Sequence, residues 1–133
     1  MEHTALIYTM VLMSAADNEM TDSELFTIGD IVRRLPVFEG FDPDQLPKTA
    51  EDCADILGQE GGLDTVIALV RDTLPQRLRE TAYAVACDIA AADGSVEPEE
   101  ARLLEMLRHG LEIERLVAAA IERGAKAHYQ TVD

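Results

Sequence analysis

Apolar residues recur at helical spacing in one segment of this chain after another, and no segment shows the strict alternation of a half-buried strand. The first segment, about residues 2–16, shows this helical spacing at Ala5, Leu6, Thr9, Leu12, Met13 and Ala16. Further segments with this period cover about residues 21–35, 49–60, 63–74, 75–92, 98–110 and 113–126. The sequence therefore predicts an all-α fold, a compact bundle of about seven helices with no sheet.

Short polar signals mark where several of these helices begin and end. Thr21-Asp22-Ser23-Glu24 has the pattern of a capping box, in which Thr21 accepts from the backbone at Glu24 and Glu24 reaches back. Pro98 is predicted at the first position of the sixth helix, with Glu100 at the third. Thr49 is predicted to cap the start of the third helix, and Gly110 to cap the end of the sixth.

Two stretches rich in glycine or proline interrupt the helical pattern. Residues 36–48 contain three prolines and one glycine, and we expect a loop whose Val37, Phe38 and Phe41 lie against the core. The Gly61-Gly62 pair is predicted to end the third helix.

Charge is the second strong constraint. The 133 residues carry a net charge of −15, although 47% of them are hydrophobic, which is enough to fill the core of one domain spanning residues 1–133. A chain so acidic has no surplus of Lys and Arg for nucleic acid or for an anionic membrane surface. The negative charge favours the binding of cations or of a partner with a basic patch. Alternatively, it only keeps the protein surface solvated.

The two cysteines and the three histidines show no spacing typical of a metal or redox site. Cys53 and Cys87 each lie in an apolar helical pattern, so we expect buried free thiols in a reducing compartment. His3, His109 and His128 are far apart in sequence and are expected to face solvent. With no visible signal peptide and no apolar run long enough to cross a bilayer, the chain is expected to be cytoplasmic.

An internal repeat links two of the predicted turns. When Asp17 is aligned with Asp93, 76 positions later, residues 15–20 lie over residues 91–96 and Glu24 lies over Glu100. The shared pattern is Ala-Ala-Asp-x-x-(Met/Val)-x-x-x-Glu, set between two helices. Two copies of one helical hairpin suggest a pseudo-twofold arrangement within the chain.

These same residues resemble the TerB-like (tellurite-resistance) family. The likeness rests on Ala91-Ala92-Asp93-Gly94-Ser95-Val96 with Glu100, and on the degenerate copy Ala15-Ala16-Asp17 with Glu24. It implies a compact bundle of about seven helices and a link to resistance against tellurite and other stresses. It also implies that the clustered acidic residues take part in metal binding. The first copy departs from the pattern, since Asn18 stands where the second copy has Gly94; asparagine tolerates the positive φ of such a turn.

The repeated turns are not complete EF-hands. If Asp93 and Glu100 took positions 5 and 12 of a calcium loop, Ile89 and Ala91 would take positions 1 and 3, and neither side chain can bind a cation. The first copy fails in the same way.

The leading hypothesis for function is nevertheless a divalent-cation site made by the two turns together. If the hairpins pack face to face, the carboxylates converge, and four of them repel unless a cation or a proton is present. Oxygen ligands suit Ca²⁺, Mg²⁺ or Mn²⁺. The predicted metal-binding residues are Asp17, Glu24, Asp93 and Glu100.

Two alternatives remain open from the sequence. In the first, the acidic turns serve only as helix caps, and the protein is an acidic interaction or scaffold module for an unidentified protein partner. The second is an enzyme, which the sequence supports least, because it contains no nucleophile elbow, no phosphate-binding glycine loop and no zinc-binding His-Glu-x-x-His. Whether the chain forms oligomers is not determined by the sequence.

Overall fold

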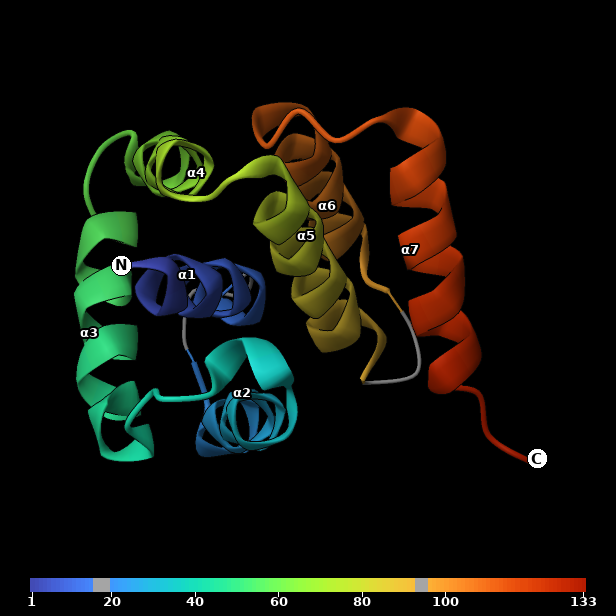
Figure 1. Cartoon of the computed structure of the whole chain (residues 1–133), viewed down its shortest axis with the longest axis horizontal. Coiled ribbons are helices and arrows are strands. Elements are labelled where there is room, and N and C mark those ends of the chain that lie inside the picture. Colours follow the sequence, from blue (N-terminus) through green and yellow to red (C-terminus); the bar gives the residue numbers. More distant parts are fainter. Residues whose placement is uncertain (16–19, 93–95) are drawn as a thin grey trace.

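The computed structural model describes residues 1–15, 20–92 and 96–133, and within these ranges every regular element is a helix. The predicted all-α fold of about seven helices is confirmed (Figure 1). The elements are α1 (Glu2–Ser14), α2 (Asp22–Arg34), η2 (Pro36–Phe38), η3 (Pro43–Gln45), α3 (Leu46–Leu57), α4 (Gly62–Thr73), α5 (Gln76–Ala91), α6 (Pro98–Gly110) and α7 (Arg115–His128). Within these ranges, none of the helices combines the length and the apolar character that a membrane span requires.

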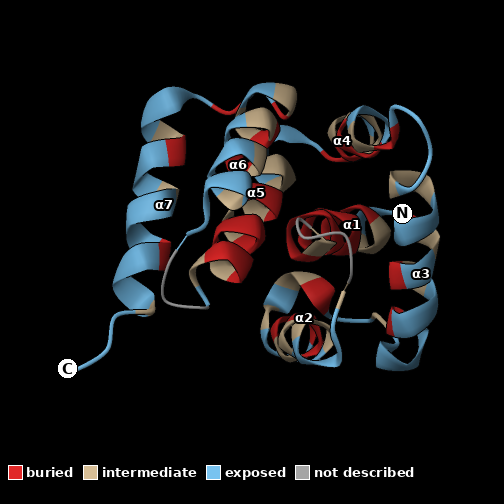
Figure 2. Ribbon diagram, turned by 180° about the vertical axis from the view of Figure 1, so that it is seen from behind, coloured by how far each residue is buried: buried red, intermediate tan, exposed pale blue. Residues whose placement is uncertain are grey.

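Helix α1 forms the centre of the bundle. It packs against α2, α3, α4 and α5, and α7 lies on the far side of α5 (Figure 1). Every residue from Ala5 to Ser14 is buried, so no face of this part of α1 reaches solvent (Figure 2). The helix predicted from the spacing of these apolar residues is present, and because it is apolar all round it is a core helix. Its buried Thr9 hydroxyl donates to the carbonyl of Ala5 at 3.0 Å, which satisfies the hydroxyl within the helix.

The connection between α2 and α3 is tighter than the sequence suggests. Residues 36–45 form η2 and η3 instead of an open loop, and Phe38 is buried while Val37 and Phe41 pack partly buried against the core, as predicted. Helix α3 begins at Leu46, with Pro47 in its first turn, so Thr49 is not the N-cap. The reason is that η3 leads directly into α3, and the Thr49 hydroxyl donates to the carbonyl of Gln45 at 2.9 Å.

The glycines near α4 and α6 have tertiary roles that differ from those predicted. Helix α3 ends at Leu57 with Gly58 as its cap, and Gly61-Gly62 instead starts α4, where Gly61 has φ +70°. A Cβ on Gly62 would collide with the backbone of Ile56. Gly110 is the last residue of α6 and not its cap, and a Cβ there would collide with Cγ2 of Ile67 on α4.

The end of α6 is closed by a residue that the sequence does not single out. Glu112 has φ +57°, and the amides of Glu112 and Ile113 donate to the carbonyls of His109 and Arg108 at 3.1 and 3.0 Å. This is the hydrogen-bond pattern of a Schellman motif, which usually has glycine at the left-handed position. Ile113 is buried next to it, and α7 starts two residues later at Arg115, after the predicted start.

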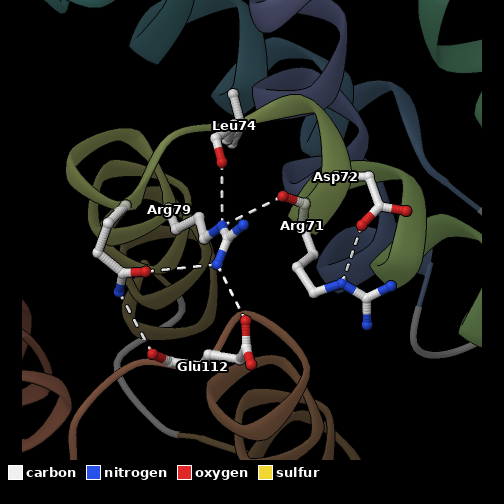
Figure 3. A network of polar contacts seen from close by, with 6 residues as sticks. Arg71, Asp72, Leu74, Arg79 and Glu112 are labelled. Carbon is white, nitrogen blue, oxygen red and sulfur yellow. Dashed lines mark hydrogen bonds and ion pairs between the residues drawn. The ribbon is translucent and has the colours of Figure 1, made fainter.

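One arginine joins three helices at this corner of the molecule. Arg79 of α5 donates through Nε to the carbonyls of Arg71 and Leu74, at 3.1 and 3.0 Å, so it caps the end of α4 (Figure 3). Its Nη1 lies 3.2 Å from Oε1 of Glu112. Because Arg71 and Leu74 lie at the end of α4 and Glu112 lies just after α6, the guanidinium fixes the ends of both helices against the start of α5.

Candidate functional site

The predicted capping box at the start of α2 is present. The Glu24 amide donates to Oγ1 of Thr21 at 3.1 Å, and Oε1 of Glu24 accepts from the backbone amide and the hydroxyl of Thr21, at 2.9 and 3.0 Å. Glu24 thus stands at the third position of α2, with its carboxylate directed to the helix start.

The start of α6 repeats this arrangement. Pro98 is the first helical residue and Glu100 the third, as predicted, and the Glu97 amide donates to Oε1 of Glu100 at 3.0 Å. The carboxylate again satisfies a backbone N–H that the helix itself leaves unpaired.

The internal repeat is visible in the element boundaries. Helices α2 and α6 each have 13 residues, and Asp22–Arg34 lies 76 positions before Pro98–Gly110 at both ends. Their inward positions also correspond, since Ile28 and Leu104 are both buried, as are Ile31 and Leu107. The repeat therefore describes two similar helical hairpins, α1–α2 and α5–α6.

The four predicted metal-binding residues are only partly within the described chain. Glu24 and Glu100 occupy equivalent helix starts, whereas Asp17 and Asp93 lie outside the described residues. Among residues 1–15, 20–92 and 96–133, no three His, Cys, Asp or Glu side chains form a group that could hold a metal ion. The convergence of the four carboxylates stays a prediction.

Several grooves border α6, and two of them also follow the repeat. The α5–α6–α7 groove has a volume of about 680 Å³ and includes Cys87, Ala91 and Val96 in its wall. The second groove, of about 500 Å³, lies between α6 and the end of α1 and includes Val11, Ala15 and Met20. Each residue of the second set lies 76 positions before its counterpart in the first. Neither groove could be predicted from the sequence, because the walls of each come from helices far apart in the chain.

Both cysteines are buried free thiols, as expected. Burial raises the pKa of Cys53 and of Cys87 to about 12, so each thiol is protonated at neutral pH and is a weak nucleophile. Cys87 lies in the wall of the α5–α6–α7 groove beside Tyr83, whose hydroxyl donates to Oε2 of Glu122 on α7 at 2.8 Å. Burial and this hydrogen bond raise the pKa of Tyr83.

The expectation that all three histidines face solvent is wrong for His3. Its Nε2 lies 2.9 Å from the carbonyl oxygen of Val37, and its ring packs at 6.0 and 5.7 Å from the rings of Phe38 and Phe41. The turn made by η2 brings these aromatic residues back to the start of α1, a contact across 34 positions that the sequence does not show. His109 and His128 are exposed, as expected.

Asp88 on α5 is half-buried between α2 and α7. Burial raises its pKa, against the opposing attraction of His128 on α7 and Arg34 on α2, and Asp30 and Tyr129 lie in the same surroundings. A raised folded-state pKa means that the folded protein holds this proton at pH values where the unfolded chain has released it. The contribution of Asp88 to stability therefore falls as the pH rises above the ordinary carboxyl range.

We expect Asp88→Asn to stabilise the protein at neutral pH, because the amide removes the cost of a partly desolvated charge. The gain should shrink as the pH falls below ~4, where Asp88 becomes protonated in the unfolded chain as well as in the folded protein. Urea unfolding over this pH range measures the difference. Asp55→Asn, at an exposed position of α3, is the control for the general effect of removing one negative charge. A gain that is equal for both variants at every pH would contradict the prediction.

A family model described as tellurite resistance protein TerB matches residues 3–123. The chain belongs to the TerB family. The match runs from α1 into α7, so the TerB family model covers both hairpins and both helix starts described above. The resemblance drawn from the repeated turns is confirmed. No curated protein and no solved structure gives a significant match.

Proposed function

We propose that this TerB-family protein acts without catalysing a reaction, by binding a divalent cation at its two acidic turns as part of a response to tellurite or other stress. The observation that supports the proposal most directly is the repeated helix start. Each turn contains an Asp seven positions before a Glu, and that Glu stands at the third position of the next helix. The two buried thiols are in keeping with action in a reducing cytoplasm.

Helix capping and cation binding are compatible at Glu24. Both hydrogen bonds from Thr21 end on Oε1, and within the described part of the chain no hydrogen bond ends on the other carboxylate oxygen, which can therefore bind a ligand. The capping bonds also hold the carboxylate in one orientation, which lowers the entropy that a cation must remove on binding. Carboxylate oxygens are suitable ligands for Ca²⁺, Mg²⁺ and Mn²⁺.

Calorimetric titration of Ca²⁺, Mg²⁺ and Mn²⁺ into chelator-treated protein tests the proposal. We expect saturable binding that is lost in Asp93→Asn/Glu100→Gln and weakened in Asp17→Asn/Glu24→Gln. Thr21→Ala is the matched control, because it removes the capping hydroxyl but keeps both carboxylates and the Thr21 backbone amide that orients Glu24. It should cost about 1 kcal/mol of stability and leave cation binding in place. If no cation gives heat or shifts the melting temperature, the proposal is wrong.

A second candidate is an interaction module for a basic partner, and the surface of α3 favours it. Exposed or half-buried Glu51, Asp52 and Asp55 lie around one lysine, Lys48, whose Nζ is 2.7 Å from Oδ1 of Asp52. This acidic surface belongs to α3 and is separate in sequence from both turns. A surface that carries mainly negative charge raises the association rate with a positively charged partner.

A further inference from the structure

The α5–α6–α7 groove has the size and the apolar wall of a small-molecule site. Its volume of about 680 Å³ falls in the range of roughly 300–1,000 Å³ typical of ligand pockets. Helices α6 and α7 both pack on α5, and α7 does so through the small buried side chains Ala118 and Ala125. The apolar wall between them is formed by Ala90, Ala91, Ala101, Leu104 and Ala125. Because these side chains are small, they leave space in the groove for the apolar part of a ligand.

The polar side chains of the groove come from opposite walls. Arg108 lies on α6 and Lys126 on α7, and each has a glutamate one turn earlier on its own helix, Glu105 and Glu122. Neither cation forms a salt bridge with any residue in the described ranges. Arg108 as a whole residue is half-buried, and its Nη2 lies 2.9 Å from Nε2 of His109.

Glu105 and Glu122 contribute less to binding a charged ligand than the two cationic side chains do. Both are exposed, and Glu122 already accepts the Tyr83 hydroxyl. Exposed carboxylates gain little from pairing, whereas the planar guanidinium of Arg108 can hold a carboxylate through two parallel, charge-assisted hydrogen bonds. The charge complementarity of the groove therefore favours an anionic head group at Arg108.

We propose that the α5–α6–α7 groove binds an amphipathic carboxylate. Its alkyl or aromatic body lies on the apolar wall, and its carboxylate lies between Arg108 and Lys126. Burying the apolar body supplies affinity roughly in proportion to its area, and the planar guanidinium supplies the preference for a carboxylate. The site uses none of the four acidic residues proposed for the cation, so the two proposals stand or fall separately.

Decanoate, titrated into the full chain and followed by calorimetry and by backbone amide NMR shifts, tests this proposal. Decanol and decyltrimethylammonium, all three kept below micelle formation, are the matched probes with the same chain and a different head group. We expect saturable binding of decanoate, with the largest shifts at residues of α5, α6 and α7, and much weaker binding of the other two. Equal binding of all three, shifts elsewhere in the bundle, or no shifts with decanoate would overturn the proposal.

Variants separate the head-group contact from the apolar wall. Arg108→Gln is expected to weaken decanoate binding about tenfold. Ala101→Phe places a ring in the groove from an exposed position of α6 and should abolish binding. Ala119→Phe, at an exposed position of α7 outside the groove, is the control and should bind as the unaltered chain does. Unchanged affinity in both Arg108→Gln and Ala101→Phe would show that the ligand does not occupy this groove.

Discussion

Met10→Ala and Leu12→Ala are each expected to lower the free energy of unfolding by about 2–5 kcal/mol. The two residues are separated by roughly 200° around α1, so on a surface helix one of them would face solvent. Both are buried, at 0% and 2% exposure, because α1 is enclosed by its neighbours. Alanine favours the helix itself, so the loss must come from the cavity and the lost apolar contacts.

Urea or thermal unfolding of the two variants measures this effect. Phe26→Ala on α2 is the control, because its ring is 70% exposed and its removal should change stability by no more than about 0.5 kcal/mol. A large loss at one of the two α1 positions with none at the other would mean that α1 is a one-sided surface helix and that its central position is wrong.

Gly110→Ala is expected to destabilise the protein by about 1–3 kcal/mol, although alanine is the better helix former. In a helix interior the same change usually stabilises by about 0.5–1 kcal/mol. At Gly110 the new Cβ would meet Cγ2 of Ile67, so α6 could keep its place on α4 only if one of the two shifted. The sign of the effect therefore distinguishes close helix packing from helix propensity.

A double-mutant cycle with Ile67→Ala isolates that contact. Because Ile67→Ala removes the colliding atom, Gly110→Ala should cost less in this background than in the unaltered chain. Gly124→Ala on α7 is the control, since its Cβ would meet nothing within 4 Å, and it should stabilise by about 0.5–1 kcal/mol. Additive effects at residues 110 and 67 would show that the two helices do not approach as closely as the structure indicates.

The parts of the candidate site that the sequence predicted are local in the chain. The capping box of Thr21 and Glu24, and the positions of Pro98 and Glu100, each depend on residues within one helical turn. The repeat was equally visible, because two hairpins of similar sequence make helices of equal length at equal spacing. In contrast, Arg108 and Lys126 lie on different helices, and only the packing of both helices on α5 brings them to one groove.

By itself, the sequence determined the helical class, most helix boundaries, the two capped helix starts and the family. These features depend on periodicity and on hydrogen bonds between neighbours in the chain, which each segment carries with it. The tertiary structure decided that α1 is the core helix, that Gly110 serves close packing, and that His3 is enclosed by Phe38 and Phe41. In each case the deciding contact joins residues that are distant in sequence. Tertiary contacts of this kind outweigh the conformational preference of a short segment, which is all that the sequence pattern reports.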